Sequence, residues 1–224
     1  MRRTKAHILA LSTTAGGQPA LRLKTTAGAI PAPGQVSLAC RTGGADAFRR
    51  TLLPLAIHLD GFTCAQPEGV RWFPGDELDL LGPLGGGFHP PPHSARWLLA
   101  ALGQPAEILM PLVHDGLDRG AQVAIWAEAP PPLPPEVEVV PLLDPAADWA
   151  DYIALAVSPG CLRHLETETA YAGVRRNAHV AEVLLLTPLA CGRGVCSACA
   201  LEGRRQRLRA CTDGPVFPLA EVLA

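Results

Sequence analysis

The first 88 residues alternate short apolar runs with turn residues. Pro33-Gly34 and Pro74-Gly75-Asp76 are turn signals, because proline fixes φ at one turn position and glycine accepts the positive φ of the next. Short strands separated by such turns predict a small antiparallel barrel or sandwich. The expected strands are His7–Leu11, Leu21–Lys24, Gln35–Cys40, Leu53–Leu59 and Glu77–Leu80.

The pattern changes after a proline-rich segment. His89-Pro90-Pro91-Pro92-His93 is typical of a stiff linker, so we expect a domain boundary near residue 92. Beyond it, continuous apolar runs predict buried strands that alternate with helices, and this order predicts a parallel sheet covered on both faces. The expected strands are Trp97–Leu102, Val123–Ala127, Val137–Val140 and Tyr152–Val157, the helices Pro105–Gly120 and Cys161–Arg176, and the rigid loop Pro130–Pro135.

Composition narrows the classes of function. The chain has 224 residues, of which 48% are hydrophobic, and a formal net charge of -2 at pH 7. This supply of apolar side chains predicts a globular protein of one or two domains, and the near-neutral balance does not favour binding to nucleic acid. No apolar run approaches the roughly 20 residues of a membrane span. The stretch His7–Leu11 is too short for a signal-peptide core, so we expect a cytoplasmic protein.

Candidate chemistry gathers near the C-terminus, where four of the seven cysteines lie. Their spacing is C-x4-C-x2-C, with the last cysteine after eleven further residues: Cys191, Cys196, Cys199 and Cys211. Thiolates at these spacings in a glycine-rich loop are typical of a plant-type [2Fe-2S] cluster. Gly192 and Gly194 let the loop pass close to the cluster with its N–H groups aimed at the sulfurs. Glu202-Gly203 predicts a hairpin that returns the fourth ligand to the site.

Other interpretations of the cysteines stay open at this point. A structural zinc site also uses four cysteines, although zinc ribbons usually show two C-x2-C knuckles and here only Cys196 and Cys199 form one. Disulfides are disfavoured, because the number of cysteines is odd and no secretory signal is found. Three cysteines in apolar contexts are expected to be buried, inert thiols: Cys40, Cys64 and Cys161.

Two stretches of the sequence resemble the electron-transfer subunit of the two-flavin dihydroorotate dehydrogenases. The first runs from Leu189 to Cys199 and resumes from Cys211 to Pro218, and the second runs from Pro74 to Phe88. The resemblance implies a ferredoxin-reductase-like, α+β multi-domain architecture. The expected parts are a reduced flavin-binding-type antiparallel β-barrel over 1–89, a nucleotide-binding-like α/β domain over 93–186 and a C-terminal [2Fe-2S] lobe over 187–224.

The resemblance also implies a partner and a pathway. Members of the family pair with a catalytic subunit that holds FMN, and they carry its electrons through the cluster toward FAD and NAD. We therefore expect a hetero-oligomer with a dihydroorotate dehydrogenase-like subunit in pyrimidine biosynthesis. The same resemblance implies FAD contacts at Pro54, Gly82 and Gly85.

The chain departs from this family where the other cofactors bind. Leu53-Pro54-Leu55-Ala56 stands where the family has Arg-Pro-x-Ser, so the charge and the hydroxyl for the FAD pyrophosphate are missing. A register that places Arg49 or Arg50 there loses the proline match. Ala100–Pro105 keeps one glycine of a phosphate-binding turn, and Val157–Leu162 keeps little of the segment that closes over nicotinamide. FAD binding is therefore in doubt, and NAD binding is disfavoured.

The sequence supports two hypotheses of different classes, and a third possibility keeps the family's whole chain with noncanonical FAD contacts. The first is an oxidoreductase subunit that relays electrons through its [2Fe-2S] cluster between a flavoprotein partner and a downstream acceptor. The second is a non-redox accessory subunit whose four cysteines hold a structural metal. The arginines between the last two cysteines either dock an acidic partner or face water: Arg204, Arg205, Arg207 and Arg209. No set of residues predicts a nucleophilic or acid–base catalytic site.

Overall fold

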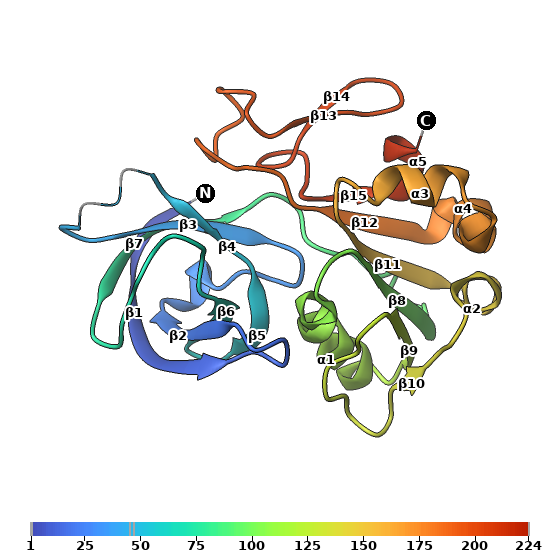
Figure 1. The fold of residues 1–224 in the computed structure, drawn as a ribbon, viewed down its shortest axis with the longest axis horizontal. Coiled ribbons are helices and arrows are strands. Elements are labelled where there is room, and N and C mark those ends of the chain that lie inside the picture. The colour runs from blue at the N-terminus through green and yellow to red at the C-terminus, as the bar shows by residue number, and fades with distance from the viewer. Residues whose placement is uncertain (1, 45, 47, 224) are drawn as a thin grey trace.

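The computed structural model describes residues 2–44, 46 and 48–223. Figure 1 shows a curled antiparallel sheet, an α/β layered structure beside it, and a C-terminal lobe above the junction of the two. This architecture confirms the predicted fold class. No helix of the described residues is long and apolar enough to cross a membrane.

Seven strands form the curled sheet, in the order β4-β3-β7-β1-β2-β6-β5. They are β1 (Arg2–Thr13), β2 (Pro19–Thr25), β3 (Val36–Arg41), β4 (Arg50–Leu52), β5 (Pro54–His58), β6 (Gly61–Ala65) and β7 (Glu77–Leu84). The five predicted strands of this half are confirmed. Strands β4 and β6 were not predicted; the first residue of β6, Gly61, has the character of a turn residue. The structure needs glycine there for close packing, since an added Cβ would lie 1.9 Å from the carbonyl oxygen of Leu23.

The second sheet has the order β10-β9-β8-β11-β12-β15. Its strands are β8 (Arg96–Leu102), β9 (Gln122–Ala127), β10 (Glu138–Val139), β11 (Tyr152–Val157), β12 (Ala181–Leu185) and β15 (Val216–Pro218). All neighbours are parallel except β15, which pairs antiparallel with β12. The predicted parallel sheet is confirmed, and the chain after Cys211 adds an edge strand to it.

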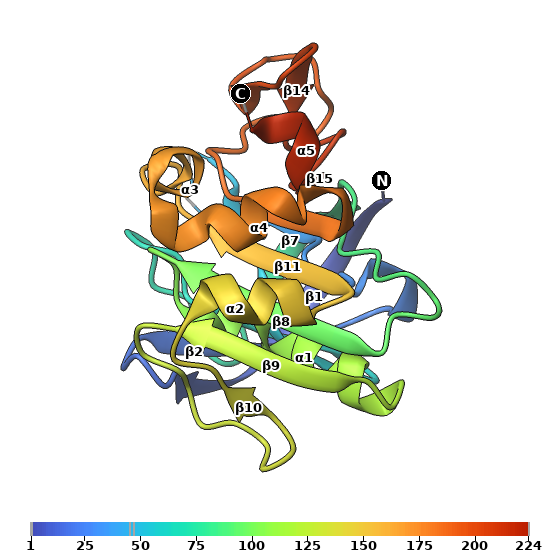
Figure 2. The same cartoon turned by 90° about the vertical axis from the view of Figure 1, so that its right-hand side faces the viewer.

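Helices cover both faces of this sheet, as Figures 1 and 2 show. The short helix η2 (Ala106–Leu109) and α1 (Met110–Asp118) cover the face toward the barrel, where α1 also approaches β5. The opposite face is covered by α2 (Leu143–Trp149), α3 (Leu162–Thr167), α4 (Ala172–Arg176) and α5 (Leu219–Val222). The predicted helix over 161–176 is broken after α3, because Glu168 adopts an extended conformation with ψ of 141°. Consecutive strand residues therefore face different helices, which explains the continuous apolar runs.

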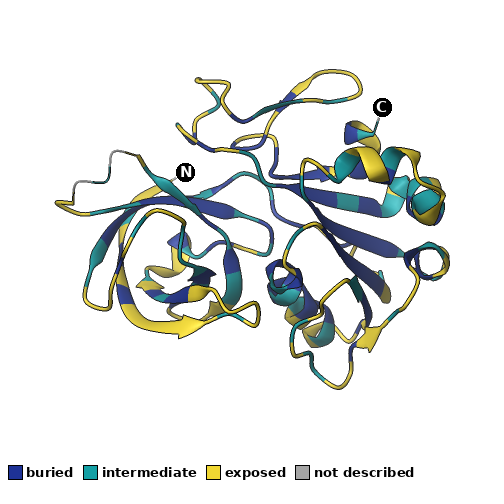
Figure 3. Cartoon of the chain, in the orientation of Figure 1, coloured by how far each residue is buried: buried dark blue, intermediate teal, exposed yellow. Residues whose placement is uncertain are grey.

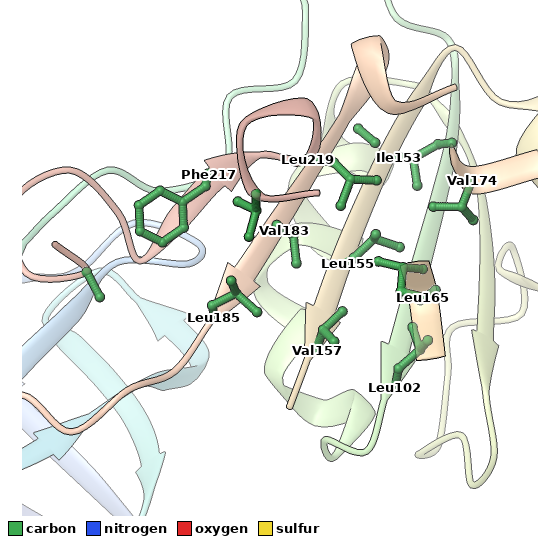
Figure 4. Packing of buried hydrophobic residues seen from close by; sticks show 14 of the residues in the cluster. Leu102, Ile153, Leu155, Val157, Leu165, Val174, Val183, Leu185, Phe217 and Leu219 are labelled. Carbon is green, nitrogen blue, oxygen red and sulfur yellow. The ribbon is translucent and has the colours of Figure 1, made fainter. Parts of the chain in front are cut away.

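One apolar core joins all three parts of the molecule. Leu38 and Leu84 of the barrel, Leu155 of the α/β sheet, and Cys199 and Cys211 of the C-terminal lobe belong to the same cluster of buried residues. Figure 4 shows Phe217 and Leu219 beside Val183 and Leu185 in this core. Figure 3 shows buried strands in the α/β sheet and a largely exposed outer edge of the C-terminal lobe. The two inner cysteines therefore rest on a packed support.

A buried carboxylate organises the barrel next to this core. Asp79 in β7 is 7% exposed and accepts hydrogen bonds from Arg3, at the start of β1, and from Arg49, just before β4. Arg49 also donates to the backbone oxygen of Asp79 at 2.7 Å. The Arg3 hydrogen bond, followed by that of Arg49, lowers the pKa of Asp79 to about 2. The ion pairs therefore stabilise the folded state wherever this carboxyl is ionised.

We expect Asp79→Asn to lower the free energy of unfolding at pH 7 by about 2 kcal/mol, the equivalent of the pKa shift. The contribution of a carboxyl with a lowered pKa is complete above its unfolded pKa and is lost as the pH falls through its folded value, so the two proteins should converge near pH 2. Urea unfolding at both pH values tests this. Glu77→Gln, at an exposed ion pair on the same strand, is the control and should change stability little. An equal loss at both pH values for Asp79→Asn contradicts the account.

Candidate metal centre

The four predicted ligands come from two neighbouring segments of the C-terminal lobe. Cys191, Cys196 and Cys199 lie in the loop between β12 and the hairpin strand β13 (Ala200–Glu202), and Cys211 follows the second hairpin strand, β14 (Arg207–Arg209). The predicted hairpin is confirmed. Its strands pair Ala200 with Arg209, which brings the chain ends at Cys199 and Cys211 together.

Positive φ angles give the cysteine loop its shape. Gly192 and Gly194 have φ of 64° and 71°, and Ser197 has φ of 56°. Glycine adopts this conformation without strain, whereas serine rarely does. An added Cβ at Gly192 would lie 3.0 Å from Leu84 of the barrel. Glycine at this position therefore lets the loop rest closely on the barrel as it turns.

The four thiols lie as two pairs. The Sγ atoms of Cys199 and Cys211 are 3.3 Å apart in a buried environment, and the side chain of Cys196 is close enough to that of Cys191 to lower its pKa. Within the described residues, no group of three or more His, Cys, Asp or Glu side chains converges in a position to hold one metal ion. A [2Fe-2S] core takes two thiolates at each of its two irons, so a division into pairs fits this group.

Backbone N–H groups point at sulfur from inside the loop. The N–H of Arg193 donates to Cys191 Sγ at 3.3 Å, and the N–H of Gly194 donates to Cys211 Sγ at 3.2 Å. The Arg193 N–H is the main reason that the pKa of Cys191 falls to about 6. Burial raises the pKa of Cys211 to about 11. Because iron binds thiolate, loading of the site releases protons, and the N–H groups then stabilise the negative sulfurs.

Arg209 has a positioning role that the sequence did not reveal. Its guanidinium donates to the carbonyl oxygen of Gly194 at 3.2 Å and pairs with Asp213 at 3.3 Å, so it links the cysteine loop to the segment after Cys211. The backbone N–H of Arg209 also donates to Asp213, at 2.9 Å. A four-residue spacing between Arg209 and Asp213 was visible in the sequence, but only the fold shows that Gly194 lies within reach.

The other arginines of the hairpin divide between two environments. Arg207 pairs with Glu202 across the hairpin at 3.2 Å, and both side chains are largely exposed. Arg204 and Arg205 line a separate pocket with Glu221. Of the four arginines between Cys199 and Cys211, Arg207 and Arg209 thus have acidic partners within the lobe.

The three residues predicted to contact FAD make packing contacts in the barrel. Gly85 has φ of 69°, and an added Cβ would lie 1.7 Å from the carbonyl oxygen of Gly214. Gly82 packs against Ser37 in the same close way, with an added Cβ 2.4 Å from its hydroxyl oxygen. Pro54 is buried and pairs with Cys64 in the barrel sheet. Both glycines make close contacts within the chain, and a role of the three residues in flavin binding stays a prediction.

The remaining cysteines lie away from the loop. Cys64 is fully buried in β6, and burial raises its pKa to about 12, as expected of an inert core thiol. Cys40 in β3 and Cys161, just before α3, were also predicted to be buried, but the structure leaves both half-buried.

Comparisons with known proteins agree with this geometry. Residues 187–223 match the family described as the iron-sulfur cluster binding domain of dihydroorotate dehydrogenase B. The chain is 27% identical, over an alignment of 241 residues that covers 87% of each protein, to the dihydroorotate dehydrogenase B (NAD(+)) electron transfer subunit of Desulforamulus reducens.

Solved structures share the fold. The NADH-dependent reduced ferredoxin-NADP oxidoreductase, studied for flavin-based electron bifurcation, has a TM-score of 0.71 at 18% identity and covers 96% of this chain and 88% of its own. A ferredoxin NADP+ reductase from Neisseria gonorrhoeae, with bound FAD and NADP, has a TM-score of 0.56 at 9% identity and covers 83% of this chain and 99% of its own. The family match and the curated relative confirm the resemblance that the sequence motifs carry, and the solved structures confirm the ferredoxin-reductase-like fold.

Proposed function

We propose that this chain is the electron-transfer subunit of a dihydroorotate dehydrogenase of the B type, passing electrons between an FMN-containing catalytic subunit and a downstream acceptor. The observation that carries the proposal is the division of the four cysteines into two thiol pairs, with loop N–H groups aimed at sulfur. A [2Fe-2S] cluster held by them supplies a one-electron couple. On this proposal the chain acts in pyrimidine biosynthesis as part of a hetero-oligomer. Its free thiols suit the reducing conditions of the cytoplasm.

The two thiol pairs differ in exposure to solvent, and this difference indicates the side from which a partner protein can approach. Cys199 and Cys211 are 2% and 3% exposed, whereas Cys196 is exposed and its neighbour Val195 is 79% exposed. The inner pair is covered by the shared apolar core. A protein that exchanges electrons with the site therefore approaches from the side of Cys191 and Cys196.

A basic pocket of about 450 Å³ adjoins this exposed side. It is lined by Arg3, Arg49, Leu81, Ala190, Cys191 and Arg193. Asp79 pairs with Arg3 and Arg49, which leaves the charge of Arg193 uncompensated by any ion pair among the described residues. Three cations facing one carboxylate give this pocket a net positive charge. We propose that an acidic side chain of the catalytic subunit enters it, because opposite charge at the rim steers association.

The function is tested by EPR of the anaerobically purified complex, before and after addition of dihydroorotate. We expect a paramagnetic [2Fe-2S] signal only after substrate is added, because one-electron reduction leaves an unpaired electron. Cys199→Ser should abolish the signal and the bound iron, since it removes a buried ligand. Cys40→Ser, outside the loop, is the matched control and should retain both. A complex that binds zinc and stays EPR-silent with substrate contradicts the proposal and favours a non-redox accessory subunit.

We expect Arg193→Glu to weaken binding to the catalytic subunit by about tenfold or more at low ionic strength, with a smaller difference at high salt. The dissociation constant measured across a salt series checks this. The visible spectrum of the cluster should be unchanged, because only the backbone N–H of Arg193 contacts sulfur. Arg163→Glu, an exposed arginine in α3, is the charge-matched control. Equal effects of the two substitutions would exclude the pocket as a docking site.

A further inference from the structure

A cleft of about 410 Å³ separates the barrel from the α/β domain, beside the residue aligned with the family's flavin-binding arginine, Leu53. Resting on the proposed function, we infer that this chain binds neither FAD nor NAD, and that its electrons leave singly to a one-electron acceptor. The lining of the cleft includes Thr51, Leu53 and Leu55 of the barrel, Glu68 of the loop after β6, and Pro105 and Glu107 of the α/β domain. Two carboxylates and no lysine or arginine stand among these described lining residues, so the walls repel a pyrophosphate.

The barrel wall of the cleft lacks the groups that bind phosphate. Thr51, Leu53 and Leu55 line it, and alternate residues of an extended chain point to opposite sides. Arg50 therefore faces away from the cleft with Leu52, which lies in the barrel core. The Nε of Arg50 is buried without a hydrogen-bond partner, yet its guanidinium lies near Gly69 on the loop after β6. The family's arginine position can be aligned with Leu53 or with one of the two preceding arginines. Neither alignment brings a cation into the cleft.

Arg49, the other arginine near this strand, is already hydrogen-bonded within the barrel. Both of its terminal nitrogens donate to Asp79, one to the backbone oxygen and one to the carboxylate, each at 2.7 Å. Turning Arg49 toward the cleft would break both hydrogen bonds and leave a buried carboxylate with fewer partners. That loss opposes any rearrangement that would create a phosphate site.

On the α/β wall of the cleft, a carboxylate lies at the start of the first helix, where free N–H donors would bind an anion. Pro105 precedes η2 and Pro111 stands in the first turn of α1, so two backbone N–H donors are missing. Glu107 lies in the first turn of η2, and its carboxylate accepts the N–H of Gly16, in the barrel turn, at 2.9 Å. A side-chain anion of the protein itself therefore bridges the two walls.

The crevice at the carboxyl ends of β8 and β11, where open α/β sheets bind nucleotides, is narrowed by side chains of the protein. Gly103 follows β8 with φ of 63°, and an added Cβ would lie 2.6 Å from the Sγ of Cys161 and 2.7 Å from the Oγ of Ser158. This glycine admits two side chains instead of a phosphate. The adjoining pocket also contains Glu107 and Glu128. The site expected for NAD is therefore both crowded and acidic.

These observations decide how electrons leave the chain. Oxidation of one dihydroorotate to orotate gives two electrons and two protons to the partner's FMN. With no flavin in this chain to collect two electrons for hydride transfer, each electron reduces one molecule of a one-electron acceptor, such as an oxidised iron-sulfur protein, and the two protons pass to solvent. Two acceptor molecules are then consumed for each orotate formed.

The inference is tested by releasing cofactors from the purified complex with acid and separating FMN from FAD by chromatography. We expect FMN from the catalytic subunit and far less than one FAD per electron-transfer subunit. Titration of the full chain with FAD, followed by flavin fluorescence, should show no saturable quenching. With dihydroorotate, the complex should reduce ferricyanide but not NAD+. One FAD per chain, or reduction of NAD+, would overturn the inference. Neither result affects the proposed function, which fails separately if substrate produces no cluster signal.

Discussion

The junction directly after Cys211 is the constraint on which the rest of the structure depends. The carbonyl oxygen of Gly214 accepts the N–H of Gly86 from the barrel at 2.6 Å, and that of Pro215 accepts the N–H of Leu185 in the α/β sheet at 2.9 Å. Phe217 then enters the shared core. Six residues of chain thus connect a predicted ligand to both other parts of the molecule. The separation of Cys211 from the cysteine loop is fixed by long-range packing, so the centre is preorganised only in the folded chain.

This packing also explains why glycine stands at particular positions of the barrel edge and the cysteine loop. Gly85 makes room for Gly214, and Gly192 makes room for Leu84, so glycines at the barrel edge and in the loop hold the C-terminal lobe against the barrel. The described residues that line the cleft beside β5 include no lysine or arginine, and Glu107 bridges its two walls. On the inference drawn above, the molecule retains the contacts that support the cysteines without those that would hold a dinucleotide. A chain specialised for one-electron relay needs only the former.

Sequence patterns predicted the elements whose signals are local. Five of the seven barrel strands, the first four parallel strands and the α1 region were expected, because their apolar period and turn residues agree with their final state. Strand β15 was missed, since three residues after a loop carry no period and become a strand only by pairing with β12. For the candidate site, the spacing of the cysteines and the two loop glycines was sufficient to predict the loop. Arg209 bridges two segments of the lobe, and Arg49 hydrogen-bonds to Asp79. Both contacts join segments that are distant in the sequence, so no local pattern predicts them.

The central claim is that the two thiol pairs hold a two-iron core on a support shared by three parts of the chain. Mössbauer spectroscopy of the protein enriched in iron-57, in oxidised and dithionite-reduced forms, tests this claim most directly. The account predicts ferric iron alone in the oxidised protein, and ferric and ferrous components of equal area after reduction, because one electron enters a pair of irons. A single iron environment that is wholly ferrous after reduction, or a protein that retains zinc and no iron, would contradict it.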